Sequence, residues 1–168
     1  MIRRCLLAST LAAVLLACRA DSPARTAIRS IGAQLNPPPP PPDTIPELLD
    51  YNANLGVNVG DMAKLPTGVL YQDVVVGNGA VAAPADSVDI AYQGWLPDGS
   101  RVDSGAVSLR LGSGTLIQGM EDAIPGMKPG GRRKLVIPPG LAYGSDGRDA
   151  IPPNAVVVYD VELRAIVR

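Results

Sequence analysis

The spacing of hydrophobic residues after position 66 predicts short strands separated by turns rich in Gly and Pro. Alternation is clearest in 87–96, where Val88, Ile90 and Tyr92 share one face and polar or small residues share the other. Pro97-Asp98-Gly99 follows directly and is typical of a tight turn. The same reasoning predicts further strands at 69–76, 101–104, 107–111, 132–137 and 155–167.

One segment changes from a two-residue period to a helical one. Four residues share one face of a two-turn helix: Ile117, Met120, Glu121 and Ile124. Because Pro125 disfavours helical geometry at the residue before it, we expect the helix to end near Ile124. The Gly/Pro-rich segment 138–154 is expected to be a long loop. The predicted fold class is therefore α+β, a twisted antiparallel sheet of five to six strands wrapped on one short α-helix.

The first residues have the pattern of an export signal. Arg3 and Arg4 precede an apolar run that ends at Cys18, and this run is shorter than the roughly 20 residues that span a bilayer. Its end, Leu15-Leu16-Ala17-Cys18, resembles a bacterial lipobox. We predict a lipoprotein-type signal peptide over 1–17 and lipidation of Cys18. The alternative is an ordinary secretory signal that is cleaved nearby, with an incidental cysteine.

Residues 18–66 are predicted to tether a domain that occupies 67–168. The tether contains six consecutive prolines at 37–42, which favour a stiff polyproline II rod of roughly 19 Å. A spacer is the favoured interpretation, and a docking motif for an aromatic groove is the alternative. The apolar residues scattered over 45–55 indicate a short helix or a flanking arm.

Composition excludes several classes of chemistry. The chain has 15 basic and 16 acidic residues, so it lacks the polybasic surface that nucleic acid binding requires. It contains no His, no Phe and only two Cys. A Ser-His-Asp triad, a His-ligated metal and a Cys-rich zinc site are therefore excluded. We expect no metal, no cofactor and no nucleic acid partner.

Five blocks follow one another in a recognisable order over about 100 residues, from Gly68 to Ile166. They are Val88–Gly99 with Val102-Asp103-Ser104, Leu111-Gly112 with Leu116–Glu121, Ile124–Lys134, Leu141–Gly144 with Ile151–Ala155, and Tyr159–Leu163. This order resembles the FKBP-type peptidyl-prolyl cis-trans isomerases. The resemblance implies that the chain accelerates rotation about X-Pro bonds. That reaction crosses a barrier of about 18–20 kcal/mol without breaking a bond, so the missing His is no obstacle.

The resemblance also implies a site. Tyr143 would donate its hydroxyl to a substrate carbonyl, the Ile117 N–H would hold the carbonyl on the other side of the proline, and the Asp103 carboxylate would lie near the rotating amide. The substrate-binding walls would be Tyr92, Val102, Val107, Leu116, Met120, Ile151 and Tyr159. Without the resemblance, most of these side chains are typical of a core and Asp103 of a turn.

The walls at three positions differ from those of many relatives. Val102, Val107 and Met120 stand where the family often has aromatic residues, which predicts a softer pocket. A non-catalytic peptide-binding module or chaperone is therefore the alternative function. Together with the export signal, the resemblance predicts a monomeric isomerase that acts on proline-containing proteins in the cell envelope, where lipidated Cys18 anchors it.

Overall fold

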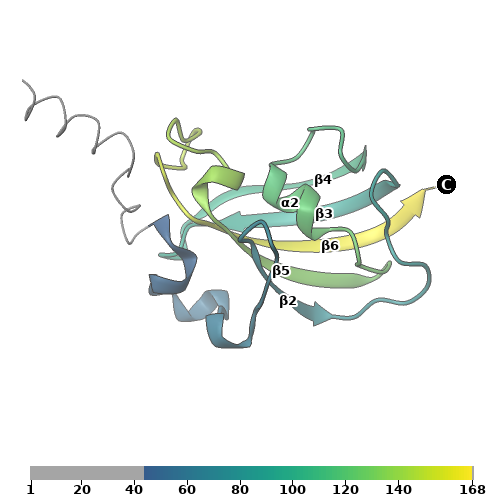
Figure 1. The fold of residues 1–168 in the computed structure, drawn as a ribbon, viewed down its shortest axis with the longest axis horizontal. Helices are drawn as coiled ribbons and strands as arrows, with labels where there is room; N and C mark the ends of the chain where they lie inside the picture. The colour runs from purple at the N-terminus through teal and green to yellow at the C-terminus, as the bar shows by residue number, and fades with distance from the viewer. Residues whose placement is uncertain (1–43, 168) are drawn as a thin grey trace, which may run out of the picture. The chain divides into compact units, whose positions relative to one another are not determined.

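The computed structural model describes residues 44–167, which form a six-stranded antiparallel sheet with one α-helix on one face (Figure 1). The strand order is β1-β2-β5-β6-β3-β4. The strands are β1 (Ala63–Lys64), β2 (Leu70–Val75), β3 (Ser87–Trp95), β4 (Arg101–Arg110), β5 (Gly131–Ile137) and β6 (Val157–Val167). The helix is α2 (Gln118–Ala123), and the 3-10 turns are η2 (Pro46–Leu48), η3 (Ala53–Leu55), η4 (Val59–Asp61) and η5 (Pro139–Leu141). The predicted fold class is confirmed.

Within this part of the chain, no helix has the length and apolar character that a membrane span needs. The predicted signal peptide, Cys18 and the proline run at 37–42 lie outside the described residues.

Strand β4 joins two stretches that the sequence pattern separates. The expected strands 101–104 and 107–111 are one continuous strand, because small residues continue the ladder between them. Gly105, for example, lies directly opposite Tyr92 of β3. The helix matches its prediction more closely, since α2 lies within 117–124 and ends before Pro125.

The two faces of the sheet have different partners. The inner face, which carries α2, packs the main core; Val88, Ile90 and Leu135 are almost completely buried there. On the outer face, Leu70, Val136 and Val158 are buried although no α-helix among the described residues covers them. The end of β5 and the start of β6 are thus buried on both sides, which explains the unbroken valines at 156–158.

The outer apolar patch is covered by residues 44–62, which we call the arm. Leu55 of η3 packs against Leu70, Val136 and Val158, so the arm contributes to the second core. Asn52 fastens it to the turn after β3: its N–H donates to the Pro97 carbonyl (2.8 Å) and its side-chain amide to the Asp98 carbonyl (2.9 Å). These contacts hold the arm against the sheet. The boundary predicted at 66/67 and the role of 18–66 as a tether stay predictions.

Arg133 joins the sheet to the end of α2. This buried side chain donates to both carboxylate oxygens of Asp73, at 2.6 and 3.0 Å, and to the Ala123 carbonyl at 2.7 Å. Its guanidinium also lies 4.6 Å from the centre of the Tyr71 ring. The helix carbonyl that would otherwise lack a partner is satisfied, and the cation is neutralised where it is buried.

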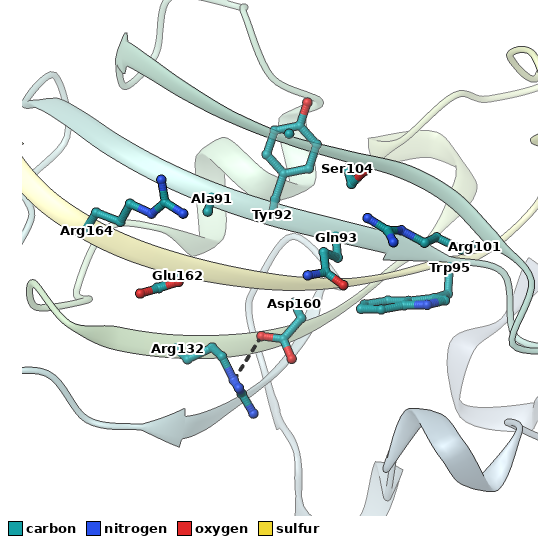
Figure 2. Close-up of a pocket in the computed structure, with 11 residues that line it drawn as sticks. Ala91, Tyr92, Gln93, Trp95, Arg101, Ser104, Arg132, Asp160, Glu162 and Arg164 are labelled. Carbon is teal, nitrogen blue, oxygen red and sulfur yellow. Dashed lines mark ion pairs between the residues drawn. The ribbon is translucent and has the colours of Figure 1, made fainter.

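The remaining outer surface is polar. A hollow of about 420 Å³ lies there. Figure 2 draws its lining residues and shows Tyr92 leaving β3 in the direction opposite to Gln93. Three arginines and two acids border it: Arg101, Arg132, Arg164, Asp160 and Glu162. Arg132 Nε lies 3.3 Å from Asp160 Oδ1. Burial raises the pKa of the Asp160 carboxyl, and the neighbouring cations Arg132 and Lys134 oppose that shift.

Leu55→Ala tests whether the arm stabilises the domain. Leu55 is 7% exposed, so we expect a loss of about 2 kcal/mol in the free energy of unfolding, at the low end for buried leucines. Leu48→Ala is the matched control, because Leu48 lies in the same arm but is 65% exposed. Urea unfolding of both variants measures the difference. Equal stability of the two variants would contradict a stabilising role.

Asp160→Asn tests the free-energy cost of the partly buried Asp160 carboxylate. Because its pKa is raised in the folded state, ionisation of Asp160 destabilises the fold once the pH exceeds the ordinary carboxyl pKa. We expect the substitution to increase the free energy of unfolding near pH 7 and to have no such effect near pH 3, where the carboxyl is mostly protonated in both states. A loss of stability near pH 7 would mean that the Arg132 ion pair outweighs desolvation.

Candidate active site

The ten predicted site residues belong to one side of the sheet. Six of them are partly buried and pack on the inner core: Tyr92, Val102, Val107, Leu116, Ile117 and Tyr143. Three form a buried floor: Met120, Ile151 and Tyr159. Asp103 is the polar member, and it is linked to this floor through the Tyr159 hydroxyl. Two hydrogen bonds and one ring contact connect Tyr92, Asp103, Tyr143 and Tyr159, while the others share the same core.

The strand register explains how Tyr159 reaches Asp103. Gly94 of β3 lies opposite Asp103 of β4 on one side and opposite Tyr159 of β6 on the other. A Cβ at Gly94 would approach the Tyr159 ring to 2.6 Å, which is closer than atoms tolerate. The ring therefore crosses β3 over a position without a side chain. This bare position lets the Tyr159 hydroxyl meet a carboxylate two strands away.

A second glycine makes room for Tyr92. Gly105 is its partner in the ladder, and a Cβ there would lie 2.9 Å from the Tyr92 hydroxyl oxygen. The Tyr92 and Tyr159 rings then meet edge to face, with centroids 6.1 Å apart and planes at 61°. Such edge-to-face pairs are favourable beyond their buried area. The two glycines thus determine where both rings lie.

Two hydrogen bonds run through the centre of the site. The Tyr159 hydroxyl donates to Asp103 Oδ2 at 3.1 Å, and the hydroxyl oxygens of Tyr143 and Tyr159 are 2.9 Å apart. Burial is the main reason why the pKa of Tyr159 is raised well above its ordinary value, and the bond with Tyr143 and the charge of Asp103 act in the same direction. Burial and the Asp103 charge likewise raise the pKa of Tyr92. Both tyrosines are therefore neutral hydrogen-bond donors at physiological pH.

Tyr143 comes from the loop after η5, which is closed by its own backbone. The Asn154 N–H donates to the Gly144 carbonyl at 2.7 Å, and Arg148 and Ile151 exchange two backbone hydrogen bonds of 2.9 and 2.7 Å. Ile151 is thereby placed on the buried floor, while the partly exposed Tyr143 ring remains at the rim. The loop holds these two predicted site residues at different depths.

Ile117 and Met120 are placed by the start of α2. Ile117 is the residue before the helix, and its carbonyl accepts from the Met120 N–H at 3.0 Å. Among residues 44–167, none accepts a hydrogen bond from the Ile117 N–H. Gly119 lets the helix lie close to the sheet, because a Cβ there would be 2.4 Å from the Ile137 side chain.

Sequence reasoning missed three residues at this site. Gly94 and Gly105 are seen only as breaks in a strand until the register places them beneath tyrosine rings. Arg148 is the third, with its guanidinium 6.0 Å from the centre of the Tyr143 ring. An exposed arginine in a Gly-rich loop carries no sequence signal that would distinguish it. The 420 Å³ hollow on the outer face was also not predicted, and its lining includes Tyr92 as its one predicted site residue.

Comparisons with known proteins agree on the kind of domain. The family model described as FKBP-type peptidyl-prolyl cis-trans isomerase matches residues 79–164. The FKBP-type peptidyl-prolyl cis-trans isomerase FkpA of Escherichia coli K12 is 42% identical over 102 residues, which are 58% of this chain and 37% of that protein. The chain thus spans little more than a third of the length of this relative.

A shorter relative is matched over nearly its whole length. The FK506-binding protein of Neisseria meningitidis serogroup B is 36% identical over 102 residues, which are 57% of this chain and 94% of that protein. The crystal structure of FkpA from Escherichia coli superposes with a TM-score of 0.59 at 32% identity, covering 86% of this chain and 68% of that one. The order of motifs, the sheet with its single described helix and these matches lead to one conclusion: the chain belongs to the FKBP-type peptidyl-prolyl cis-trans isomerase family.

Proposed function

We propose that this protein accelerates cis-trans isomerisation of X-Pro bonds in other proteins. The observation that carries the proposal is a line of two hydroxyls and a carboxylate, from Tyr143 through Tyr159 to Asp103, above an apolar floor. The matching family and its relative FkpA of Escherichia coli are named for the same activity, which supports the proposal. Because rotation of an amide breaks no bond, the site needs neither a nucleophile nor a cofactor.

Desolvation supplies part of the acceleration. Water stabilises the planar, charge-separated form of an amide, so a pocket without water destabilises that ground state. Met120 and Ile151 are 2% and 6% exposed, and the side chains of Val102, Val107 and Leu116 add further apolar surface. A prolyl ring bound against this floor loses its hydration on that side.

Hydrogen bonds that strengthen as the amide twists supply the rest. The unused Ile117 N–H is suited to hold a substrate carbonyl at one end of the site. The Tyr143 hydroxyl at the rim is suited to donate to the carbonyl at the other end. The Asp103 carboxylate lies beside the rotating bond without accepting a proton. These roles agree with those that the resemblance implies.

The aliphatic walls favour a second candidate function. With valine at 102 and 107 and methionine at 120, the pocket offers a weaker surface to a prolyl ring than aromatic walls would. A non-catalytic peptide-binding module or chaperone would need only that surface. The two functions differ in one measurement, the rate of prolyl isomerisation.

Asp103→Val and Tyr143→Phe test the isomerase. We expect each to lower kcat/KM on a proline tetrapeptide by about tenfold, the cost of one interaction made in the transition state, while the far-UV spectrum stays unchanged. Asp149→Asn is the matched control, because it neutralises an exposed carboxylate in the neighbouring loop. A wild-type protein that gives no acceleration, yet suppresses aggregation of an unfolded client, would favour the chaperone. Parallel loss of fold and activity would make the two residues structural.

We further propose that the chain is exported and lipid-anchored. The Arg-led apolar run and the lipobox-like end at Cys18 support a signal peptide over 1–17 with acylation of Cys18. The proline run at 37–42 then acts as a spacer between membrane and domain. The clients would be proline-containing segments of proteins in the cell envelope, bound by a monomer.

Cys18→Ala tests the anchor, with Cys5→Ala as its control. We expect Cys18→Ala to abolish incorporation of a labelled fatty acid and to block removal of the signal, because the modified thiol is absent. Cys5→Ala should be processed normally, since Cys5 lies inside the apolar run that is removed. Normal processing of Cys18→Ala would rule out the lipoprotein signal.

A further inference from the structure

The hydroxyl of Tyr159 lies between two groups to which the proposed function assigns direct roles. Tyr159 is fully buried on β6, and its hydroxyl contacts Asp103 Oδ2 at 3.1 Å and the Tyr143 hydroxyl at 2.9 Å. A phenylalanine would fill the same apolar wall. The Tyr159 hydroxyl is therefore not needed for packing, and its contribution must come from its two hydrogen bonds.

Counting protons determines the direction of both hydrogen bonds. A tyrosine hydroxyl has one proton, whereas a carboxylate can only accept. Tyr159 donates its proton to Asp103, so it has none left for Tyr143. Across the 2.9 Å contact, Tyr143 is then the donor and Tyr159 the acceptor. In the empty site, the only Tyr143 hydroxyl proton is directed inward.

We propose that Tyr159 is a positioning residue that holds the Tyr143 hydroxyl and the Asp103 carboxylate in their active geometry. The inference rests on the proposed isomerase function. A substrate carbonyl must take the Tyr143 proton from Tyr159, so binding exchanges one hydrogen bond for another and gains little affinity. Tyr159 keeps donating to Asp103 throughout, because that bond uses its own proton.

The surroundings keep this arrangement rigid. A side chain at Gly94 would clash with the Tyr159 ring, and the Tyr92 ring of the same strand meets it edge to face, with centroids 6.1 Å apart. Full burial raises the pKa of Tyr159, so the proton that it gives to Asp103 is retained at physiological pH. The charged groups that act on the neighbouring Tyr92 hydroxyl are Asp103, which raises its pKa, and Arg148, which lowers it.

Tyr159→Phe separates a positioning role from that of a wall. The variant keeps the ring, frees the Tyr143 hydroxyl and removes the donor to Asp103. We expect kcat on a proline tetrapeptide to fall about fivefold, because Tyr143 and Asp103 are no longer held in place. KM should stay equal or decrease, because the substrate carbonyl no longer competes with Tyr159 for the Tyr143 hydroxyl proton. Tyr51→Phe is the matched control: it removes a hydroxyl that donates to the Pro46 carbonyl at 2.6 Å in the arm, and both constants should stay unchanged.

A raised KM with unchanged kcat would mean that the Tyr159 hydroxyl contributes only to substrate binding, and unchanged values of both would leave Tyr159 as a simple wall; either result overturns the proposal. A second readout needs no enzymatic activity. In NMR spectra of the wild type, we expect a slowly exchanging hydroxyl proton on Tyr143, which is lost in Tyr159→Phe and retained in Tyr51→Phe. If this proton exchanges equally fast in wild type and Tyr159→Phe, the link between the hydroxyls is absent. A wild type without isomerase activity but with the protected proton would refute the proposed function and leave the hydrogen-bond geometry intact.

Discussion

The site depends on one steric constraint, the passage of the Tyr159 ring over the bare position at Gly94. A ring on β6 can reach a carboxylate on β4 only if the strand between them carries no side chain at the position that the ring crosses. Gly94 meets this condition, and the hydroxyl arrives within hydrogen-bond distance of Asp103. The hydroxyl of the loop residue Tyr143 is hydrogen-bonded to the same Tyr159 hydroxyl. Three segments that are distant in the sequence thereby form one polar line inside an apolar core.

The rest of the domain supports that line from both faces of the sheet. On the inner face, Arg133 joins the end of α2 to β2 through Asp73, and Met120 of the same helix is buried in the core. On the outer face, the arm covers Leu70, Val136 and Val158, so the central strands are buried on both sides at these positions. The strands that carry the site are therefore held in one close-packed sheet.

Much of the fold could be predicted because it follows from local patterns. Alternation located β3 closely, the helical period located α2 to within one residue at each end, and Pro125 correctly predicted its end. The division of β4 into two strands was wrong, since small residues at 104–106 lower the hydrophobic alternation without interrupting the ladder. Contacts between residues far apart in the sequence, such as Asp73 and Arg133, could not be predicted, because no local pattern indicates them.

Motif order, periodicity and composition were enough to identify the family, the class of fold and the residue types available for chemistry. The absence of His and Phe excludes imidazole chemistry and phenylalanine walls from any site in this chain. The tertiary structure alone decided which hydroxyl donates to which acceptor, because a hydrogen bond depends on distances of about 3 Å between strands that are neighbours only after folding. It also showed why Gly94 is needed, since the missing side chain matters only beneath the ring that crosses it.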